Sequence, residues 1–123
     1  MGLGMAPSNT FARVEFNQKF GMLSVYATIM EIPFICTSYS RTAAEQHRLF
    51  LVGGKTYCDG YEKISMHQLD RARDIAIVDE TGAIVNDYGD HPSYAVLGEF
   101  WESLGGIWGG RWKDPYDIFH FEL

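Results

Sequence analysis

The sequence predicts an α+β fold, in which a small, mainly antiparallel sheet carries helices packed on one side. Helical and strand-like patterns follow one another in the order helix, strand, helix, loop, hairpin, helix, strand. The connections around the hairpin are too short for the crossovers that parallel strands require. Because 123 residues suffice for one hydrophobic core, we expect a single domain over residues 1–123.

The first element is a helix, because apolar residues recur at spacings of three and four. This pattern extends from about Phe11 to Met30. Residues 1–9 hold glycine, proline and serine, and we expect them to fray. Pro33 prevents the helix from continuing, and the β-prone run from Phe34 to Tyr39 predicts the first strand.

A second helix is predicted over Ala43–Leu51 by signals at both of its ends. Thr42 and Glu45 have the spacing of a capping box, and Gly53-Gly54 is a typical helix stop. Arg41 would then lie between the first strand and this helix.

A long loop and a hairpin follow the second helix. Residues 53–66 predict an irregular loop, with Asp59-Gly60 as its turn. Ala72–Val78 alternates and is rich in β-branched residues, which predicts a strand. Asp79–Gly82 is a turn signal, so Ala83–Val85 would pair with this strand as a hairpin.

The last third of the chain predicts one more helix and one more strand. Pro92 opens the helix and Gly105-Gly106 ends it, with apolar residues at helical spacing at Tyr94, Leu97, Trp101 and Leu104. The residues after this helix are rich in turn formers and aromatic side chains, and a strand starts at about Ile118.

Composition disfavours several classes of partner. No apolar run reaches the roughly 18–20 residues that span a membrane, so we expect no membrane insertion. A net charge of −6 without runs of lysine or arginine disfavours nucleic acid. The start of the chain lacks a basic segment followed by an apolar block, so we expect no signal peptide and synthesis in the cytoplasm. We expect a monomer with two free thiols, of which Cys36 would be buried in its strand.

Two stretches contain candidate metal ligands. His67, Asp74 and His120 would supply three nitrogen and oxygen donors, the set typical of a catalytic zinc ion with a fourth position for water. An ionised Asp74 beside the apolar row of its strand is costly unless a counter-charge or a metal ion compensates it. The alternative is that Asp74 lies on an exposed face and pairs with Arg71 or Arg73.

Asp117 and His120 are three residues apart, which in an extended strand means opposite faces and about 10 Å between them. They can address one site only if the chain bends between them, and Asp114-Pro115 favours a bend nearby. Asp117 would then suit the acid and base of a metal-assisted hydrolysis. Otherwise Asp117 is a solvated turn residue and His120 a half-buried one. The remaining histidines, His47 and His91, are expected to be structural or exposed.

Three segments also carry a family resemblance when they are taken together. The stretch Ser65–Asp74, SMHQLDRARD, resembles a motif SxHxxGxAxD, and the tail, with Trp108–Trp112 and Asp117–Glu122, resembles WGGDW…DxxHFE. Ser38–Thr42 with Gln46 resembles the strand-to-helix segment of the same proteins. These are the M15 zinc peptidases, which include D-alanyl-D-alanine carboxypeptidases and dipeptidases and L-alanyl-D-glutamate endopeptidases of phage lysis. The matches keep the family's order and cover all but about the first 15 residues.

The resemblance implies a DD-peptidase-like (Hedgehog-like) fold and a Zn²⁺ cofactor with three ligands, His67, Asp74 and His120. It implies that Asp117 is the catalytic acid and base. Arg41 would hold a substrate carbonyl or carboxylate and stabilise the oxyanion, for which its guanidinium group is suited. Ser65 and Gln46 would contact the substrate.

Two residues depart from the family pattern. Asp70 stands where the motif has glycine, and aspartate tolerates a positive φ better than most residues. As an acid near the metal, Asp70 could change the metal affinity or compete as a ligand. Arg111 stands where WGGDW has aspartate, so the partner of that acid must differ here.

We therefore expect a zinc metallopeptidase that acts on peptidoglycan stem peptides. The aspartate form of the base and the short single domain favour an L-alanyl-D-glutamate endopeptidase of the endolysin kind, from a phage or prophage. It would be made in the cytoplasm and act on the cell wall in the periplasm. One alternative is a D-Ala-D-Ala carboxypeptidase. The other is a catalytically inactive, zinc-containing module that binds the cell wall.

Overall fold

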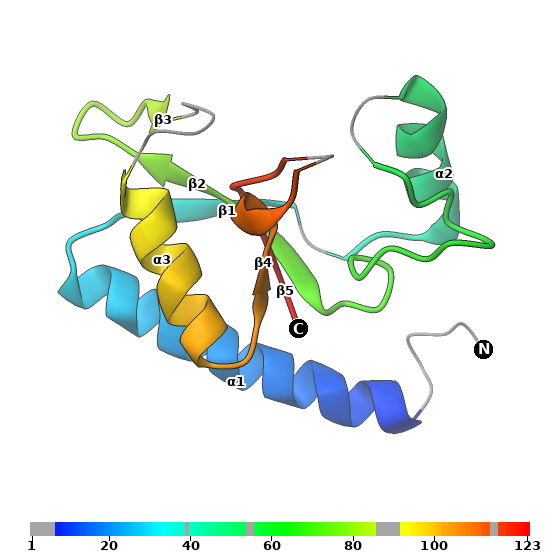
Figure 1. The fold of residues 1–123 in the computed structure, drawn as a ribbon, viewed down its shortest axis with the longest axis horizontal. Coiled ribbons are helices and arrows are strands. Elements are labelled where there is room, and N and C mark those ends of the chain that lie inside the picture. The colour runs from blue at the N-terminus through cyan, green and yellow to red at the C-terminus, as the bar shows by residue number, and fades with distance from the viewer. Residues whose placement is uncertain (1–6, 39, 54–55, 86–91, 114–115) are drawn as a thin grey trace.

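The computed structural model describes residues 7–38, 40–53, 56–85, 92–113 and 116–123 (Figure 1). In order along the chain the elements are α1 (Pro7–Ile29), β1 (Phe34–Ser38), α2 (Ala43–Val52), β2 (Ala72–Val78), β3 (Ile84–Val85), α3 (Pro92–Ser103), β4 (Ile107–Trp108), the 3₁₀ turn η2 (Gly109–Arg111) and β5 (His120–Glu122). The sheet order is β1-β2-β5-β4, and β3 also pairs with β2. Every pairing is antiparallel, which confirms the α+β expectation.

Helix α1 begins earlier than its apolar periodicity predicts. Residues 7–9 belong to the helix, so the expectation that they fray is wrong. Pro7 suits the first helical position because it lacks an amide hydrogen that would have no partner there. Asn9 is buried, and its Nδ2 donates a hydrogen bond of 3.0 Å to the carbonyl oxygen of Leu69. This contact ties the start of α1 to the turn before β2. No helix in the described ranges combines the length and the apolar character that a membrane crossing needs.

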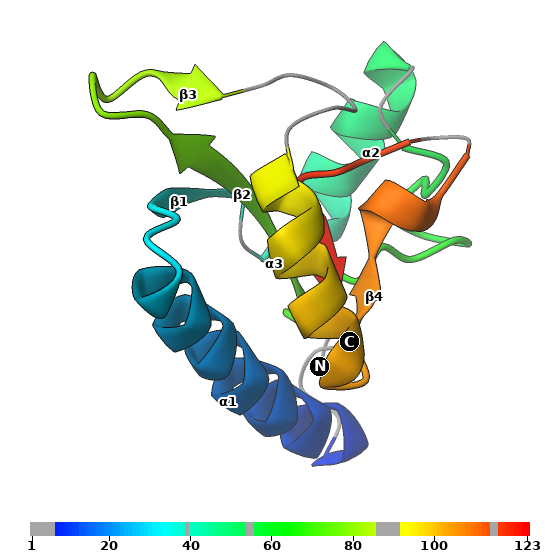
Figure 2. The ribbon, with the colours of Figure 1, turned by 60° about the vertical axis from the view of Figure 1, so that its left-hand side comes forward.

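The core lies between the sheet and two of the three helices. Phe16 of α1 packs edge-on against Trp101 of α3, and Trp101 packs edge-on against Phe121 of β5. All three side chains are almost fully buried. Figure 1 shows α2 apart from α1 and α3, and Figure 2 shows α1 and α3 from a second direction. Helix α2 instead bonds to the loop after it, through Gln46 and His47, so only two helices share the core.

Strand β2 is the centre of the sheet and matches its predicted bounds. Ile75, Ala76 and Ile77 are buried, as expected for a strand that is paired on both edges. The hydroxyl of Tyr94 accepts a hydrogen bond from Ile77 N and donates one to Val85 O, which fixes α3 over the hairpin.

The local end signals of α2 and of the hairpin are confirmed. Thr42 and Glu45 form the reciprocal capping box, and α2 ends at Val52 before Gly53, which has φ +81°. Asp79 Oδ1 accepts hydrogen bonds from the backbone of residues 81 and 83 in the turn that Gly82 closes. Both cysteines are free, but Cys36 is half-buried and not buried as expected. Tyr39, Gly54, His91 and Asp114-Pro115 lie outside the described residues.

The aromatic tail contains two elements that the sequence did not predict, β4 and η2. Trp108 ends β4, and its ring lies so close to Gly98 and Gly110 that a Cβ at either position would collide with it. Trp108 Nε1 donates to Ile118 O at 2.8 Å, which joins β4 to the chain entering β5. Gly98 of α3 and Gly110 therefore make room for the Trp108 ring. The sequence did not predict β4 because a strand of two residues is too short to show an alternating pattern.

Candidate metal centre and active site

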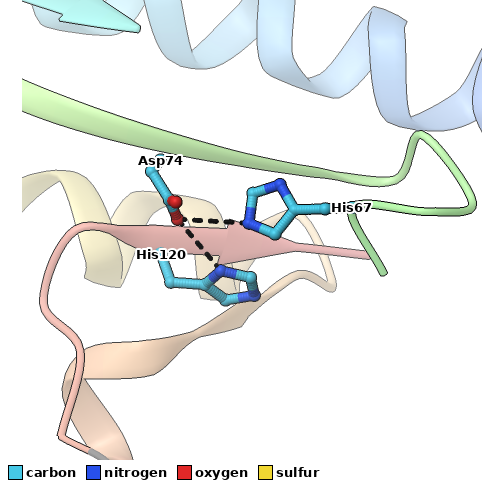
Figure 3. A group of neighbouring side chains, drawn as sticks. All are labelled: His67, Asp74 and His120. Atoms are coloured by element: carbon cyan, nitrogen blue, oxygen red, sulfur yellow. Dashed lines mark hydrogen bonds and ion pairs between the residues drawn. The ribbon is translucent and has the colours of Figure 1, made fainter. Parts of the chain in front are cut away.

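Three ligand atoms meet at the centre of the sheet (Figure 3). Asp74 of β2 lies directly across the ladder from His120 of β5, and the turn before β2 supplies His67. His67 Nε2 lies 3.3 Å and His120 Nδ1 3.1 Å from Asp74 Oδ1. The three ligand atoms all lie within 4.8 Å of one another, and no other described residues form such a group. Two imidazoles and one carboxylate, two of them buried, fit a Zn²⁺ ion with an open fourth position.

The turn that presents His67 is built by its neighbours. Ser65 Oγ accepts a hydrogen bond from His67 N, and Ser65 N donates to Gln68 Oε1, a reciprocal arrangement like a capping box. His67 O accepts from Arg41 N at 2.9 Å, which joins the turn to the start of α2. Ser65 is buried, so its first role is to shape the turn. It also lines the pocket beside His67, where a substrate contact remains a prediction.

Asp70 closes the same turn, and its carboxylate binds two arginines. Its φ is +55°, which confirms that the residue in place of the motif glycine adopts the left-handed conformation. Its two carboxylate oxygens bind Arg13 of α1 and Arg73 of β2, each at 2.9 Å. Asp70 therefore does not compete as a ligand, contrary to one of the sequence-based possibilities. The arginine that contacts Asp74 is Arg41, whereas Arg73 binds Asp70 and Arg71 Nε donates to Leu123 O.

Asp117 reaches the same pocket because the chain bends after it. His120 N donates to Asp117 O at 3.3 Å across a turn at Ile118 and Phe119, so the expected bend lies at these residues. Asp117 N donates to Gly109 O at 3.1 Å. A Cβ at Gly109 would collide with Asp117 O and lie 3.1 Å from His120 Cβ. The first glycine of the WGG segment, Gly109, thus permits the close approach that aligns Asp117 with His120.

The electrostatics of the metal-free site follow from burial and from these contacts. Burial disfavours the charged form of Asp74, but hydrogen bonds from His120 and His67 outweigh it and hold the pKa of Asp74 below its usual range. Burial likewise opposes a charge on His120, yet its bonds to Asp74 and Glu122 raise its pKa to about 9. Burial, and then the nearby charge of Asp74, raise the pKa of Asp117. A raised pKa suits a carboxylate that must exchange protons near neutral pH.

Glu122 is a candidate functional residue that the sequence reasoning did not single out. Its Oε1 lies 2.8 Å from His120 Nε2. Because a carboxylate only accepts hydrogen bonds, both ring nitrogens of His120 donate here, Nδ1 to Asp74 and Nε2 to Glu122. When Nδ1 gives up its proton to bind a metal, Glu122 would keep the remaining proton on Nε2. Carboxylates that orient a histidine in this way are typical of metal sites. The signal was the glutamate two residues after His120 in the HFE segment.

Arg41 faces the site from its position before α2. Nη2 lies 3.4 Å from Asp74 Oδ2 and donates to Ser38 Oγ at 3.0 Å, while Nη1 donates to Gln46 Oε1 at 2.9 Å. Gln46 is fully buried, and its Nε2 donates to Cys58 O. Gln46 therefore holds Arg41 from behind and does not face the pocket, unlike the substrate contact that the resemblance implies.

A cavity of about 540 Å³ opens over these residues. Its lining includes Arg41, Asp74 and Asp117, and the opposite wall comes from the loop after α2, including Cys58 and Lys63. Trp112 packs against the His120 ring, with ring centroids 5.0 Å apart, and also lines the cavity.

Arg111, the other departure from the motif, lies outside this cavity lining. It binds Glu102 of α3 at 3.0 Å and stacks on Trp108. Its side chain is half-exposed, so this replacement alters a surface contact and leaves the ligand set unchanged. His47 bonds to Asp59 O through Nδ1, which confirms its structural role.

The chain is also similar to known proteins in sequence and in structure. A family model described as D-alanyl-D-alanine carboxypeptidase, of the M15 peptidases, matches residues 59–123, more than half of the chain. No curated protein sequence matches the chain.

Among solved structures, the L-Ala D-Glu endopeptidase ChiX of Serratia marcescens is similar with 23% identity and a TM-score of 0.56, over 75% of this chain and 67% of that one. The LD-carboxypeptidase LdcB has 16% identity and a TM-score of 0.65, over 89% of this chain and 57% of that one. A mutant of the vancomycin resistance D,D-pentapeptidase VanY, in complex with Zn(II), has 18% identity and a TM-score of 0.56, over 88% of this chain and 70% of that one. The chain thus spans less than two thirds of LdcB. At these identities the likeness shows the DD-peptidase-like fold.

Proposed function

The chain belongs to the M15 peptidase family, and from this premise we propose that it is a zinc-dependent peptidase that cleaves peptidoglycan stem peptides. The observation that carries the proposal is the convergence of His67, Asp74 and His120 within 4.8 Å. Asp117 lines the same cavity, which gives the site a carboxylate that is not a ligand. A donor set with a separate base is what metal-assisted hydrolysis requires.

The chain's own residues supply the remaining chemistry. Zn²⁺, when bound, would polarise the scissile carbonyl and lower the pKa of water. Asp117 takes the proton from the attacking water and later delivers it to the leaving amine. Arg41 donates to the oxygen on which negative charge develops, and its guanidinium is already oriented by Gln46 and Ser38.

We propose the bond between L-Ala and D-Glu as the preferred target. The aspartate base supports this choice through the family resemblance. Among the similar structures, the endopeptidase ChiX shares 23% identity with this chain, the LD-carboxypeptidase LdcB 16% and the D,D-pentapeptidase VanY 18%. The description of the matching family favours D-Ala-D-Ala carboxypeptidase as the second candidate. An endolysin-like role in cell-wall lysis is the biological setting that we propose.

The test has a chemical and a functional arm. Purified protein should contain one zinc ion per chain, and outer-membrane-permeabilised Gram-negative cells should lose turbidity when it is added. Mass spectrometry of the released muropeptides identifies the bond, since loss of a terminal D-Ala and cleavage after L-Ala give different masses. Asp117→Ala should keep its zinc and lose about 10²–10⁴-fold in rate, the usual contribution of a general base. Glu80→Ala, an exposed turn acid, is the matched control and should remain active.

Two outcomes would contradict the proposal in different ways. If wild type and Asp117→Ala both bind zinc and both fail to cut, the result contradicts the peptidase and favours an inactive wall-binding module. If the purified protein contains no zinc and a chelator changes nothing, the metal centre itself is wrong.

A further inference from the structure

The described lining of the catalytic cavity contains one arginine and one lysine, Arg41 and Lys63. Arg41 is already bound on several sides, since its guanidinium group donates to Ser38 and Gln46 and contacts Asp74. Lys63 differs, because no acid among the described residues forms an ion pair with it. The cavity therefore has a cation whose charge the described part of the chain does not use.

The three acids of the described lining are committed to other groups. Asp74 contacts both imidazoles of the candidate metal centre, and Glu122 bonds to one of them. Asp117 is the carboxylate that we assign to proton transfer. These acids repel a substrate that carries a carboxylate into the cavity, unless a cation compensates the repulsion. Lys63 lines the same cavity and can supply that compensation.

The backbone of Lys63 is held in place by a bonded turn. Asp59 Oδ1 accepts hydrogen bonds from three consecutive backbone amides, the last of which is that of Lys63, and Gly60 N donates to Lys63 O at 3.1 Å. The turn is anchored on two sides: His47 Nδ1 of α2 lies 2.9 Å from Asp59 O, and Gln68 Nε2 donates to Gly60 O at 2.8 Å. A cation on such a turn is positioned before the substrate arrives, which reduces the entropy cost of binding.

The two bonds that we consider for cleavage have an anion in the same place. In the stem peptide D-Glu continues through its γ-carboxyl group, so its α-carboxylate is free. In a terminal D-Ala–D-Ala bond, the last residue carries the C-terminal carboxylate. In both substrates a carboxylate is thus attached to the carbon that bears the leaving amine. Since Arg41 is assigned to the oxyanion, this second negative charge requires a second cation.

We propose that the ammonium group of Lys63 pairs with this α-carboxylate and makes the enzyme select substrates that are negatively charged beside the leaving amine. This assignment rests on the proposed peptidase function and names the substrate feature that the site reads. Hydrogen bonds between two charged groups are stronger than those between neutral ones, so replacing the carboxylate by an amide weakens the contact.

The test compares peptides that differ only in this charge. One pair is L-Ala-γ-D-Glu-L-Lys with the α-carboxylate of D-Glu free or converted to a carboxamide. The other is a peptide that ends in D-Ala-D-Ala, with its C-terminus free or amidated. The zinc-loaded wild type should cut the free member of one pair with a KM about tenfold below that of its amide. The pair that is cut identifies the source of the carboxylate.

Three variants show whether Lys63 makes this selection. Lys63→Gln should raise KM for the free peptide about tenfold with kcat nearly unchanged, and it should leave both constants for the amide as they are. Lys63→Arg keeps the positive charge and should keep the preference for the free peptide. Arg48→Gln removes an exposed cation of α2 outside the described cavity lining, and as the matched control it should change neither peptide's constants.

The outcomes separate this assignment from the proposed function. If wild type cuts and Lys63→Gln affects the free peptide and its amide equally, or affects neither, the pairing is wrong and the peptidase function stands. If wild type cuts none of the peptides, the proposed function is refuted. Calorimetric binding then decides about Lys63, because equal affinity of wild type for carboxylate and amide would overturn the pairing. Unfolding in urea shows whether each variant is folded.

Discussion

Glu122 offers a sharp test of the metal centre because it touches the site through one ligand only. Its carboxylate lies 2.8 Å from His120 Nε2 and keeps the proton on that nitrogen. Glu122→Ala removes the acceptor and the charge, whereas Glu122→Gln removes only the charge. The backbone of residue 122 should stay in place in both variants, since it pairs with Ala72 and Ile107 and its carbonyl accepts from Trp101.

The expected magnitudes follow from this difference. Loss of a carboxylate that orients a metal-bound histidine costs about 10–100-fold in metal affinity. That range corresponds to about 1.4–2.8 kcal/mol. Glu122→Ala should lie near the upper end, because Glu122 is only 15% exposed and water reaches His120 Nε2 poorly. Glu122→Gln should lie near the lower end, since its amide oxygen can still accept the hydrogen bond.

Zinc affinity is measured by competition with a chromophoric chelator at fixed pH, and unfolding by urea confirms that each variant is folded. Glu102→Ala removes an acid of α3 that binds Arg111 on the surface, and it should leave zinc affinity unchanged. If Glu122→Ala binds zinc within twofold of wild type, Glu122 does not orient a ligand and the assignment of His120 Nδ1 to the metal is wrong.

Three further predictions concern the turn, the tail and pH. Asp70→Ala should lower the free energy of unfolding in urea by about 2 kcal/mol, because it removes two partly exposed ion pairs worth about 0.5 kcal/mol each and places alanine at φ +55°, which costs about 1 kcal/mol. Asp70→Gly should lose only the ion pairs. Equal losses in the two variants would contradict this division. Gly109→Ala should displace Asp117 and lower the peptidase rate about a hundredfold, while the far-ultraviolet circular dichroism spectrum stays unchanged. A Gly109→Ala variant with full activity would show that Asp117 need not be held at this position. The proton on His120, whose pKa is raised to about 9, stabilises the fold in the absence of zinc; this contribution is complete below pH 6.5 and is lost as pH rises through 9. Because zinc displaces this proton, zinc should bind up to about tenfold more tightly per pH unit in that window. A flat profile would contradict a proton on His120.

The sequence predicted those parts of the fold that depend on local periodicity and local end signals. The bounds of β2 and the capping box of α2 agree with the structure because each is decided by neighbours in the chain. The start of α1 and the pair β4 and η2 were missed. Asn9 is helical because it bonds to Leu69, sixty residues away, and no local pattern contains that contact.

The sequence predicted which residues gather at the candidate site, but it did not predict which of their neighbours face the site and which support it from outside. His67, Asp74, His120 and Asp117 meet as the spacing and the resemblance suggested. Whether an acid faces the metal or turns to an arginine depends on tertiary neighbours, which is why Asp70 was misjudged as a possible ligand. Gln46 was expected to meet substrate, but a residue that lies next to Arg41 in the fold can equally support it from behind.

The bonds between α1 and the turn before β2 join two distant regions of the molecule. Asn9 holds Leu69, and Arg13 holds Asp70, three residues after the ligand His67. The turn that presents His67 is therefore held from outside by a helix that supplies none of the three candidate metal donors. Thermodynamic linkage requires any coupling between the two regions to be mutual: whatever free energy the docked start of α1 adds to zinc affinity, bound zinc must add to the docking of α1.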